Sequence, residues 1–200
     1  MRSVATLSQI KDFAIRIQAV VTIAIVVSIG APCGRAEQGA PVTGAEARPR
    51  SVPSPGTPAP LFSAERLDGG SLSLKSLRGH VVLLNFWAVN CPPCRIEMPE
   101  LEQIHRRYRG RGLRVIGVTE MDPTRDQARR FIEEAGVTYP ILLDPGARIG
   151  DLYALEAHPT TLVIDADGRV RFLNAGYLKG EETEIERAVL EALGAGYGRR

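Results

Sequence analysis

A continuous apolar run stands near the middle of the chain. Residues 81–87 read Val-Val-Leu-Leu-Asn-Phe-Trp, and Asn85 is the only polar residue among them. A run without alternating polar positions is typical of a strand that is covered on both faces, as at the centre of the sheet in α/β folds. A second short β-rich run follows at residues 113–119. The pattern therefore predicts a buried strand at 81–87 and another strand at 113–119.

Other segments complete an alternation of helices and strands. Apolar residues recur at helical spacing after residue 91, where Met98, Leu101, Ile104 and Tyr108 share one face. Further helices are predicted over residues 123–135, 147–155 and 181–193, and further strands over residues 62–67, 71–74, 139–143, 160–165 and 170–174. Turns at residues 68–70 and 167–168 mark two hairpins. The order β-β-β-α-β-α-β-α-β-β-α predicts an α/β domain, with an N-terminal β-hairpin and a central mixed sheet flanked by helices.

The N-terminal segment predicts export. Arg2, Lys11 and Arg16 precede a mostly apolar stretch at residues 17–31. Basic residues stay on the cytoplasmic side of a membrane, so we expect the rest of the chain on its outer side. Residues 1–36 form either a signal peptide, cleaved after Ala36, or a short membrane anchor that is retained. Lipidation at Cys33 is a third outcome, and a cytosolic protein that buries this stretch is the alternative.

Composition then sets the domain boundaries. Residues 37–58 are rich in Pro, Gly and Ala and poor in large apolar groups, so they cannot bury enough surface to fold. We predict that they form a flexible linker between the membrane and the domain. The folded domain is predicted at residues 59–196, and a disordered tail at residues 197–200.

Charge and cysteine content narrow the class of protein. The net charge of +2 argues against a dedicated nucleic-acid binder, and we expect a monomer without a nucleic-acid partner. Two of the three cysteines form one C-x-x-C pair and the third is Cys33. This is too few for a disulfide framework, and the pair lacks the second ligand pair of a structural zinc site. The spacing therefore favours redox use.

The motif Cys91-Pro92-Pro93-Cys94 directly follows the buried strand and opens a helix. A helix N-terminus stabilises an anion, so Cys91 is the expected nucleophile. Cys94, one turn on, would resolve the mixed disulfide, and Pro92 and Pro93 suit a first helical turn. A redox-active disulfide of this kind needs no added cofactor or metal. A static disulfide and a Cu(I) or Zn site on both thiolates are the alternatives.

Two blocks of sequence resemble one family. Residues 82–88 with 91–99, and residues 158–165 followed by Asp167-Gly168, closely resemble the TlpA/ResA-like branch of the thioredoxin superfamily, which has a redoxin or AhpC/TSA-type domain. The resemblance spans roughly residues 58–193. It implies a thioredoxin fold with an inserted helical segment after the second core strand. It also implies a membrane-tethered reductase in the periplasm or its Gram-positive equivalent, whose relatives act on apocytochrome c or on oxidase-assembly proteins.

The resemblance also assigns roles to individual residues. Pro159 matches the family's cis-proline, which faces the disulfide and leaves a backbone edge to pair with the substrate. Thr160 follows it and is placed with the substrate-binding residues. His158 should lie near Cys91, where an imidazolium would stabilise the thiolate, unless the ring turns to solvent.

Two further residues match family positions close to the cysteines. Glu97 matches a glutamate that assists proton movement at the thiols, and its alternative is a solvated helix glutamate. Asn85 takes the place of the buried aspartate of ordinary thioredoxins, so Glu97 is expected to substitute for that group. Trp87 matches a strand-end aromatic, which either packs in the core or contacts substrate. Asn90 departs from the family, since most relatives carry tryptophan there, and this leaves the substrate open.

The sequence thus predicts a thiol–disulfide oxidoreductase that delivers two electrons to a cysteine-containing protein substrate. A DsbD/CcdA-type membrane protein is the electron donor that the resemblance implies. An oxidase or isomerase with the same residues and a non-enzymatic Cu(I) chaperone are the main alternatives. A peroxidase fits less well, because peroxidatic cysteines occupy a different helix-capping context.

Overall fold

The computed structural model describes residues 51–197. The predicted signal peptide or anchor, Cys33 and residues 37–50 of the predicted linker lie outside the described residues. Within the described part of the chain, no helix has both the length and the apolar character needed to cross a bilayer.

Strand β3 (Val81–Trp87) is the centre of a five-stranded sheet, and all seven of its residues are buried. The strand order is β5-β4-β3-β6-β7, where β4 is Leu113–Thr119, β5 is Ile141–Leu143, β6 is Thr160–Ile164 and β7 is Val170–Ala175. β3 pairs in parallel with β4 and antiparallel with β6. The predicted mixed sheet is therefore confirmed, and the run without polar alternation is explained by helices and loops on both faces.

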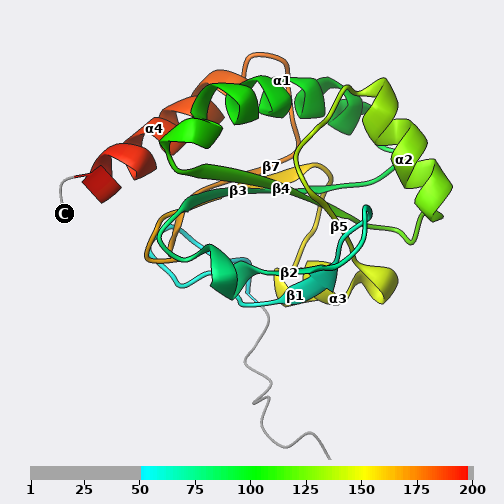
Figure 1. Cartoon of the computed structure of the whole chain (residues 1–200), viewed down its shortest axis with the longest axis horizontal. Coiled ribbons are helices and arrows are strands. Elements are labelled where there is room, and N and C mark those ends of the chain that lie inside the picture. The colour runs from blue at the N-terminus through cyan, green and yellow to red at the C-terminus, as the bar shows by residue number, and fades with distance from the viewer. Residues whose placement is uncertain (1–50, 198–200) are drawn as a thin grey trace, which may run out of the picture. The chain divides into compact units, whose positions relative to one another are not determined.

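Helices cover both faces of this sheet (Figure 1). α1 (Pro92–Tyr108), α2 (Arg125–Glu134) and α4 (Glu182–Tyr197) lie on one face, and α3 (Arg148–Leu152) lies with the N-terminal hairpin on the other. Short 3-10 turns stand at Leu74–Leu77, Arg109–Arg111 and Pro145–Ala147. α2 follows the second core strand of the sheet, β4, which confirms the inserted helical segment.

Alternation along β3 divides the core in two. Leu83 and Trp87 join the apolar cluster under α1, α2 and α4, whereas Leu84 and Phe86 join the cluster under α3 and the hairpin. Because successive side chains of a strand point to opposite faces, Asn85 has the same orientation as Leu83 and Trp87. The one polar residue of the strand therefore faces α1, the helix that carries both cysteines.

Several predicted boundaries need correction. The hairpin strands are shorter than expected, at Ser63–Glu65 (β1) and Ser71–Ser73 (β2), and they form a separate two-stranded sheet. The helix predicted at residues 147–155 spans only Arg148–Leu152, because Ala147 before it and Ala154 after it have positive φ and cannot continue a right-handed helix.

The predicted linker and tail also extend too far into the domain. The amide of Gly56 donates to Val170 in β7, the amide of Val170 donates to Thr57, and Pro58 bridges to Arg169. These backbone contacts need no large apolar side chains, so composition did not reveal them, and the linker prediction is wrong for residues 56–58. At the other end α4 continues through Tyr197, so the predicted tail is wrong at that residue.

Candidate active site

Cys91 caps the N-terminus of α1, directly after the loop that leaves β3. It forms a disulfide with Cys94, and the two Cα atoms are 5.3 Å apart. The amide of Cys94 donates to the Cys91 sulfur over 3.2 Å. Cys91 keeps 7% of its surface exposed while Cys94 has none. The predicted geometry is confirmed: the outer sulfur sits where a helix N-terminus would stabilise a thiolate, and the inner one lies beneath it.

The two prolines between the cysteines occupy the first turn of α1. Pro92 is exposed and Pro93 is half-buried. Neither has an N–H group, and the first turn of a helix has no partner for one. The free amide that reaches the Cys91 sulfur therefore comes from Cys94, the first residue of the turn that can donate.

Glu97 is completely buried one turn after Cys94. Its Oε2 accepts a hydrogen bond from Asn85 Nδ2 over 2.7 Å, and its Oε1 accepts one from the Thr161 hydroxyl over 2.8 Å. Burial raises the pKa of the Glu97 carboxyl to about 7, and the two hydrogen bonds oppose that rise. The alternative of a solvated helix glutamate is wrong. Residues three apart share a helix face, so this carboxyl lies on the side of α1 that carries Cys94.

The peptide bond between His158 and Pro159 is cis, as the family resemblance implied. Pro159 is buried, and its carbonyl accepts the amide of Gly176 over 2.7 Å. Thr160 is also buried, and its hydroxyl donates to the carbonyl of Ala157 over 2.7 Å. That hydroxyl closes the loop before the proline, and the role of Thr160 in binding substrate stays a prediction.

His158 is half-buried, and its Nε2 has no hydrogen-bond partner among the described residues. Desolvation lowers the pKa of the imidazole below its ordinary value of 6.5. The neutral ring is therefore the favoured form at pH 7 while the disulfide is intact. A charged imidazolium at this position would require the negative charge of a nearby thiolate.

Trp87 has no exposed surface. Its ring stacks on Phe131 of α2 with centroids 4.6 Å apart, and the guanidinium of Arg95 lies over the Phe131 ring at 4.4 Å. Trp87 therefore packs in the core and supports the inserted helix. The prediction that it contacts substrate is wrong, because the side chain does not reach the surface.

Sequence reasoning missed a buried pair of carboxyl groups on the other face of the sheet. Glu120 follows β4 and lies close to Asp144, whose carboxylate accepts the amides of Ile149 and Gly150 in α3. A Cβ at Gly150 would collide with the Glu120 carboxyl, so a larger residue there would force that carboxyl to move. Burial and the neighbouring Asp144 raise the pKa of Glu120 to about 8. No signal at either position in the sequence indicated that the two residues meet.

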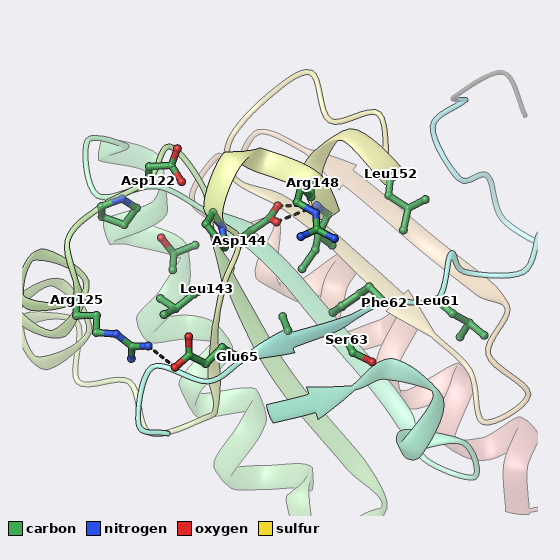
Figure 2. A pocket seen from close by; sticks show the side chains of 15 residues that line it. Leu61, Phe62, Ser63, Glu65, Asp122, Arg125, Leu143, Asp144, Arg148 and Leu152 are labelled. Carbon is green, nitrogen blue, oxygen red and sulfur yellow. Dashed lines mark hydrogen bonds and ion pairs between the residues drawn. The ribbon is translucent and has the colours of Figure 1, made fainter. Parts of the chain in front are cut away.

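A cavity of about 630 Å³ lies beside this pair, between the hairpin, α3 and the carboxyl ends of β4 and β5. Figure 2 shows Phe62 and Leu143 among its apolar lining and the ion pair of Glu65 with Arg125 at its edge. None of the predicted site residues lines it. The cavity is therefore separate from the residues that the sequence assigns to disulfide exchange.

The raised pKa values predict a pH dependence of stability. A carboxyl whose pKa is 4.5 when unfolded and about 7 when folded keeps its proton in the folded state, so its stabilising contribution is full below pH 4.5 and lost as pH rises through about 7. Glu97 alone should account for a loss of the order of 3 kcal/mol over this range. Glu120 adds a loss of the same sign that extends to about pH 8.

Urea unfolding of the disulfide form at a series of pH values checks this prediction. Glu97→Gln should flatten the slope between pH 4.5 and 7, and Glu120→Gln should flatten the part that extends to pH 8. If the Glu97→Gln variant kept the full slope of the wild type, the assignment to Glu97 would be refuted.

Together, a mixed sheet, a helix-capping cysteine, a buried second cysteine and a cis-proline directly before β6 define a thioredoxin-fold thiol–disulfide oxidoreductase. Comparison with known proteins supports this class. The AhpC/TSA family model matches residues 55–173. The chain therefore belongs to the AhpC/TSA family, and within the thioredoxin superfamily to the TlpA/ResA-like oxidoreductases.

Two relatives and one solved structure support the same class of protein. The chain is 34% identical over 135 residues to the thiol-disulfide oxidoreductase ResA of Halalkalibacterium halodurans. This alignment covers 68% of this chain and 76% of that protein. It is 37% identical over 131 residues to the thioredoxin-like protein YneN of Bacillus subtilis, over 64% and 76% of the two chains. A solved structure from Chlorobium tepidum, described as a thiol:disulfide interchange protein DsbE, is similar with a TM-score of 0.67 and 29% identity, over 72% of this chain and all of that one.

Proposed function

We propose that this protein is a reductase that acts outside the cytoplasmic membrane and reduces disulfides in protein substrates of cytochrome c maturation or oxidase assembly. The observation that carries the proposal is the arrangement of the cysteines: the slightly exposed Cys91 sulfur caps α1, and the buried Cys94 shares a face of that helix with the buried Glu97. The basic residues before the apolar stretch at 17–31 support export. A DsbD/CcdA-type membrane protein would restore the dithiol.

The reaction follows from the position of each sulfur. The Cys91 thiolate attacks a substrate disulfide, forms a mixed disulfide and releases one substrate thiolate. Cys94 then passes its proton to the Glu97 carboxylate and attacks the Cys91 sulfur. This step forms the Cys91–Cys94 disulfide and releases the second substrate thiolate, so two electrons have moved to the substrate. The Glu97 proton returns to solvent or to the departing thiolate.

The loop before the cis-proline suggests how a protein substrate would be held. Within the described residues, the backbone N–H and C=O groups of His158 make no hydrogen bond, although the next residue, Pro159, is paired with Gly176. An extended substrate segment could pair with this free backbone, in the manner of an added strand. Such pairing would be independent of substrate side chains, which suits a reductase that acts on cysteines in different surroundings.

The reduction potential tests the direction of the reaction. If the protein is a reductase, equilibration of the Cys91–Cys94 pair with glutathione should give a reduction potential of about −250 mV, which is close to the potential of thioredoxin. A value near about −120 mV, the level of DsbA, would instead identify an oxidase with the same site. Tight Cu(I) binding by the reduced pair, with no disulfide exchange, would identify the copper chaperone.

A Cys94→Ser variant is expected to trap the substrate. Without the resolving sulfur, the mixed disulfide at Cys91 should persist, since no other cysteine of the domain can attack it. The probe is an oxidised peptide that carries the C-x-x-C-H haem-attachment sequence of an apocytochrome c, and the adduct is measured by mass spectrometry without reductant. The matched control is the Cys91→Ser, Cys94→Ser double variant. Absence of adduct with the single variant would contradict the proposal.

A further inference from the structure

Three buried polar side chains form a closed ring of hydrogen bonds between α1 and the central sheet. Asn85 comes from β3, Glu97 from α1 and Thr161 from β6, and none of them has exposed surface. Asn85 Nδ2 donates to Glu97 Oε2 over 2.7 Å and to the Thr161 hydroxyl oxygen over 2.9 Å. The Thr161 hydroxyl donates to Glu97 Oε1 over 2.8 Å. Each carboxylate oxygen thus receives one hydrogen bond, and the two donors are fixed on neighbouring strands of one sheet.

We propose that Thr161 and Asn85 are positioning residues, which hold the Glu97 carboxylate ready to accept the proton of Cys94. The inference rests on the proposed proton-accepting role of Glu97 and adds the two residues that make it possible. In the step concerned, the proton of the Cys94 thiol moves to the Glu97 carboxylate. The sulfur of Cys94 bonds to that of Cys91, and the substrate thiolate leaves the mixed disulfide with the electron pair.

The direction of the hydrogen bonds gives Thr161 a defined part. The hydroxyl oxygen of Thr161 accepts a hydrogen bond from Asn85 Nδ2. Its single proton is therefore free to point to Glu97, to which it donates. Valine has nearly the same shape and would suit the centre of a buried strand without the cost of desolvating a hydroxyl. The hydroxyl at this position is therefore accounted for by its contact with the carboxylate.

The charges around Glu97 explain why donors are needed there. Burial opposes the ionised form, and so does the nearby carboxylate of Glu181 before α4. Tyr139, before β5, and Tyr177, after β7, also lie near Glu97. The negative charge of the Glu97 carboxylate contributes to the raised pKa of each phenol. The hydrogen bonds from Asn85 and Thr161 are the contributions that favour the carboxylate, and with them its pKa stays at about 7. At that value the carboxyl can both take and return a proton near neutral pH.

The experiment measures the reactions of the two cysteines as two successive kinetic phases. Full-length protein carrying Cys33→Ser, so that only the pair reacts, is reduced and mixed with 5,5′-dithiobis(2-nitrobenzoate). Attack by Cys91 releases one coloured thionitrobenzoate, and resolution by Cys94 releases the second. Thr161→Val should leave the first phase unchanged and slow the second about fivefold at pH 7, with its pH midpoint about one unit higher, because a hydrogen bond to the carboxylate has been lost.

Two further variants make the result decisive. Thr161→Ser restores the hydroxyl and should return the second phase to the wild-type pH profile, which a purely structural role for the threonine would not require. Glu97→Gln should remove the midpoint near pH 7 from the second phase and leave only the rise that follows ionisation of the Cys94 thiol itself. If Glu97→Gln leaves that profile unchanged, the proposed role of Glu97 fails and this inference with it. If Glu97→Gln changes the profile but Thr161→Val does not, this inference alone is overturned.

Discussion

Replacing Cys91 by serine is expected to reduce disulfide-reductase turnover to the uncatalysed background. Disulfide exchange needs a sulfur that can form a covalent bond with the substrate sulfur, and a serine hydroxyl cannot form one. The remaining Cys94 has no exposed surface and lies beneath the first turn of α1, so it cannot reach a substrate disulfide by itself. The measurement is reduction of insulin in the presence of dithiothreitol, followed by the precipitation of the insulin B chain.

The matched control is Cys94→Ser, which removes the other half of the same pair. It should still release one thionitrobenzoate from 5,5′-dithiobis(2-nitrobenzoate), at a rate close to the first phase of the wild type, whereas Cys91→Ser should release none at that rate. Both variants also carry Cys33→Ser. Rapid release by Cys91→Ser would show that Cys94 is the nucleophile, and the assignment of the two roles would have to be reversed.

The parts of the site that the sequence could predict are those that depend on local structure. A buried strand followed at once by a C-x-x-C and a helical pattern places Cys91 at a helix N-terminus, whatever the rest of the fold. Glu97 follows Cys94 by three residues, so the shared face of the helix was also a local consequence. The cis bond before Pro159 was different, because local chemistry favours trans, and only the family resemblance pointed to it.

The parts that the sequence could not predict depend on contacts between distant segments. Thr161 lies 64 residues after Glu97, and only the pairing of β3 with β6 brings it to that carboxyl. The orientation of Trp87 depends on α2, which is part of the inserted segment and supplies Phe131. Residues 56–58 were assigned to the linker for the same reason, since their partners Arg169 and Val170 are more than 100 residues away and the contacts are made by the backbone.

Trp87→Ala is expected to destabilise the domain by about 3–5 kcal/mol, the usual cost of deleting a large buried aromatic side chain. Trp87 has no exposed surface, and its removal would leave Phe131 and the inserted α2 without their stacking partner. A domain of this size is stable by only about 5–15 kcal/mol, so the variant should unfold at a much lower urea concentration. Unfolding is followed by circular dichroism, because Trp87 is the only tryptophan of the chain and its fluorescence is lost with it.

Two controls separate core packing from contact with substrate. Ile96→Ala removes an aliphatic side chain from α1 that is 50% exposed, and it should change the free energy of unfolding by less than about 1 kcal/mol. Trp87→Phe keeps an aromatic ring in the core and should recover a large part of the stability that alanine loses. Under conditions where the Trp87 variants are folded, their kcat/KM for insulin should stay within about threefold of the wild type, because a buried ring makes no contact with substrate. A tenfold fall in kcat/KM for a fully folded Trp87→Phe variant would instead show that this ring is exposed to substrate during the reaction.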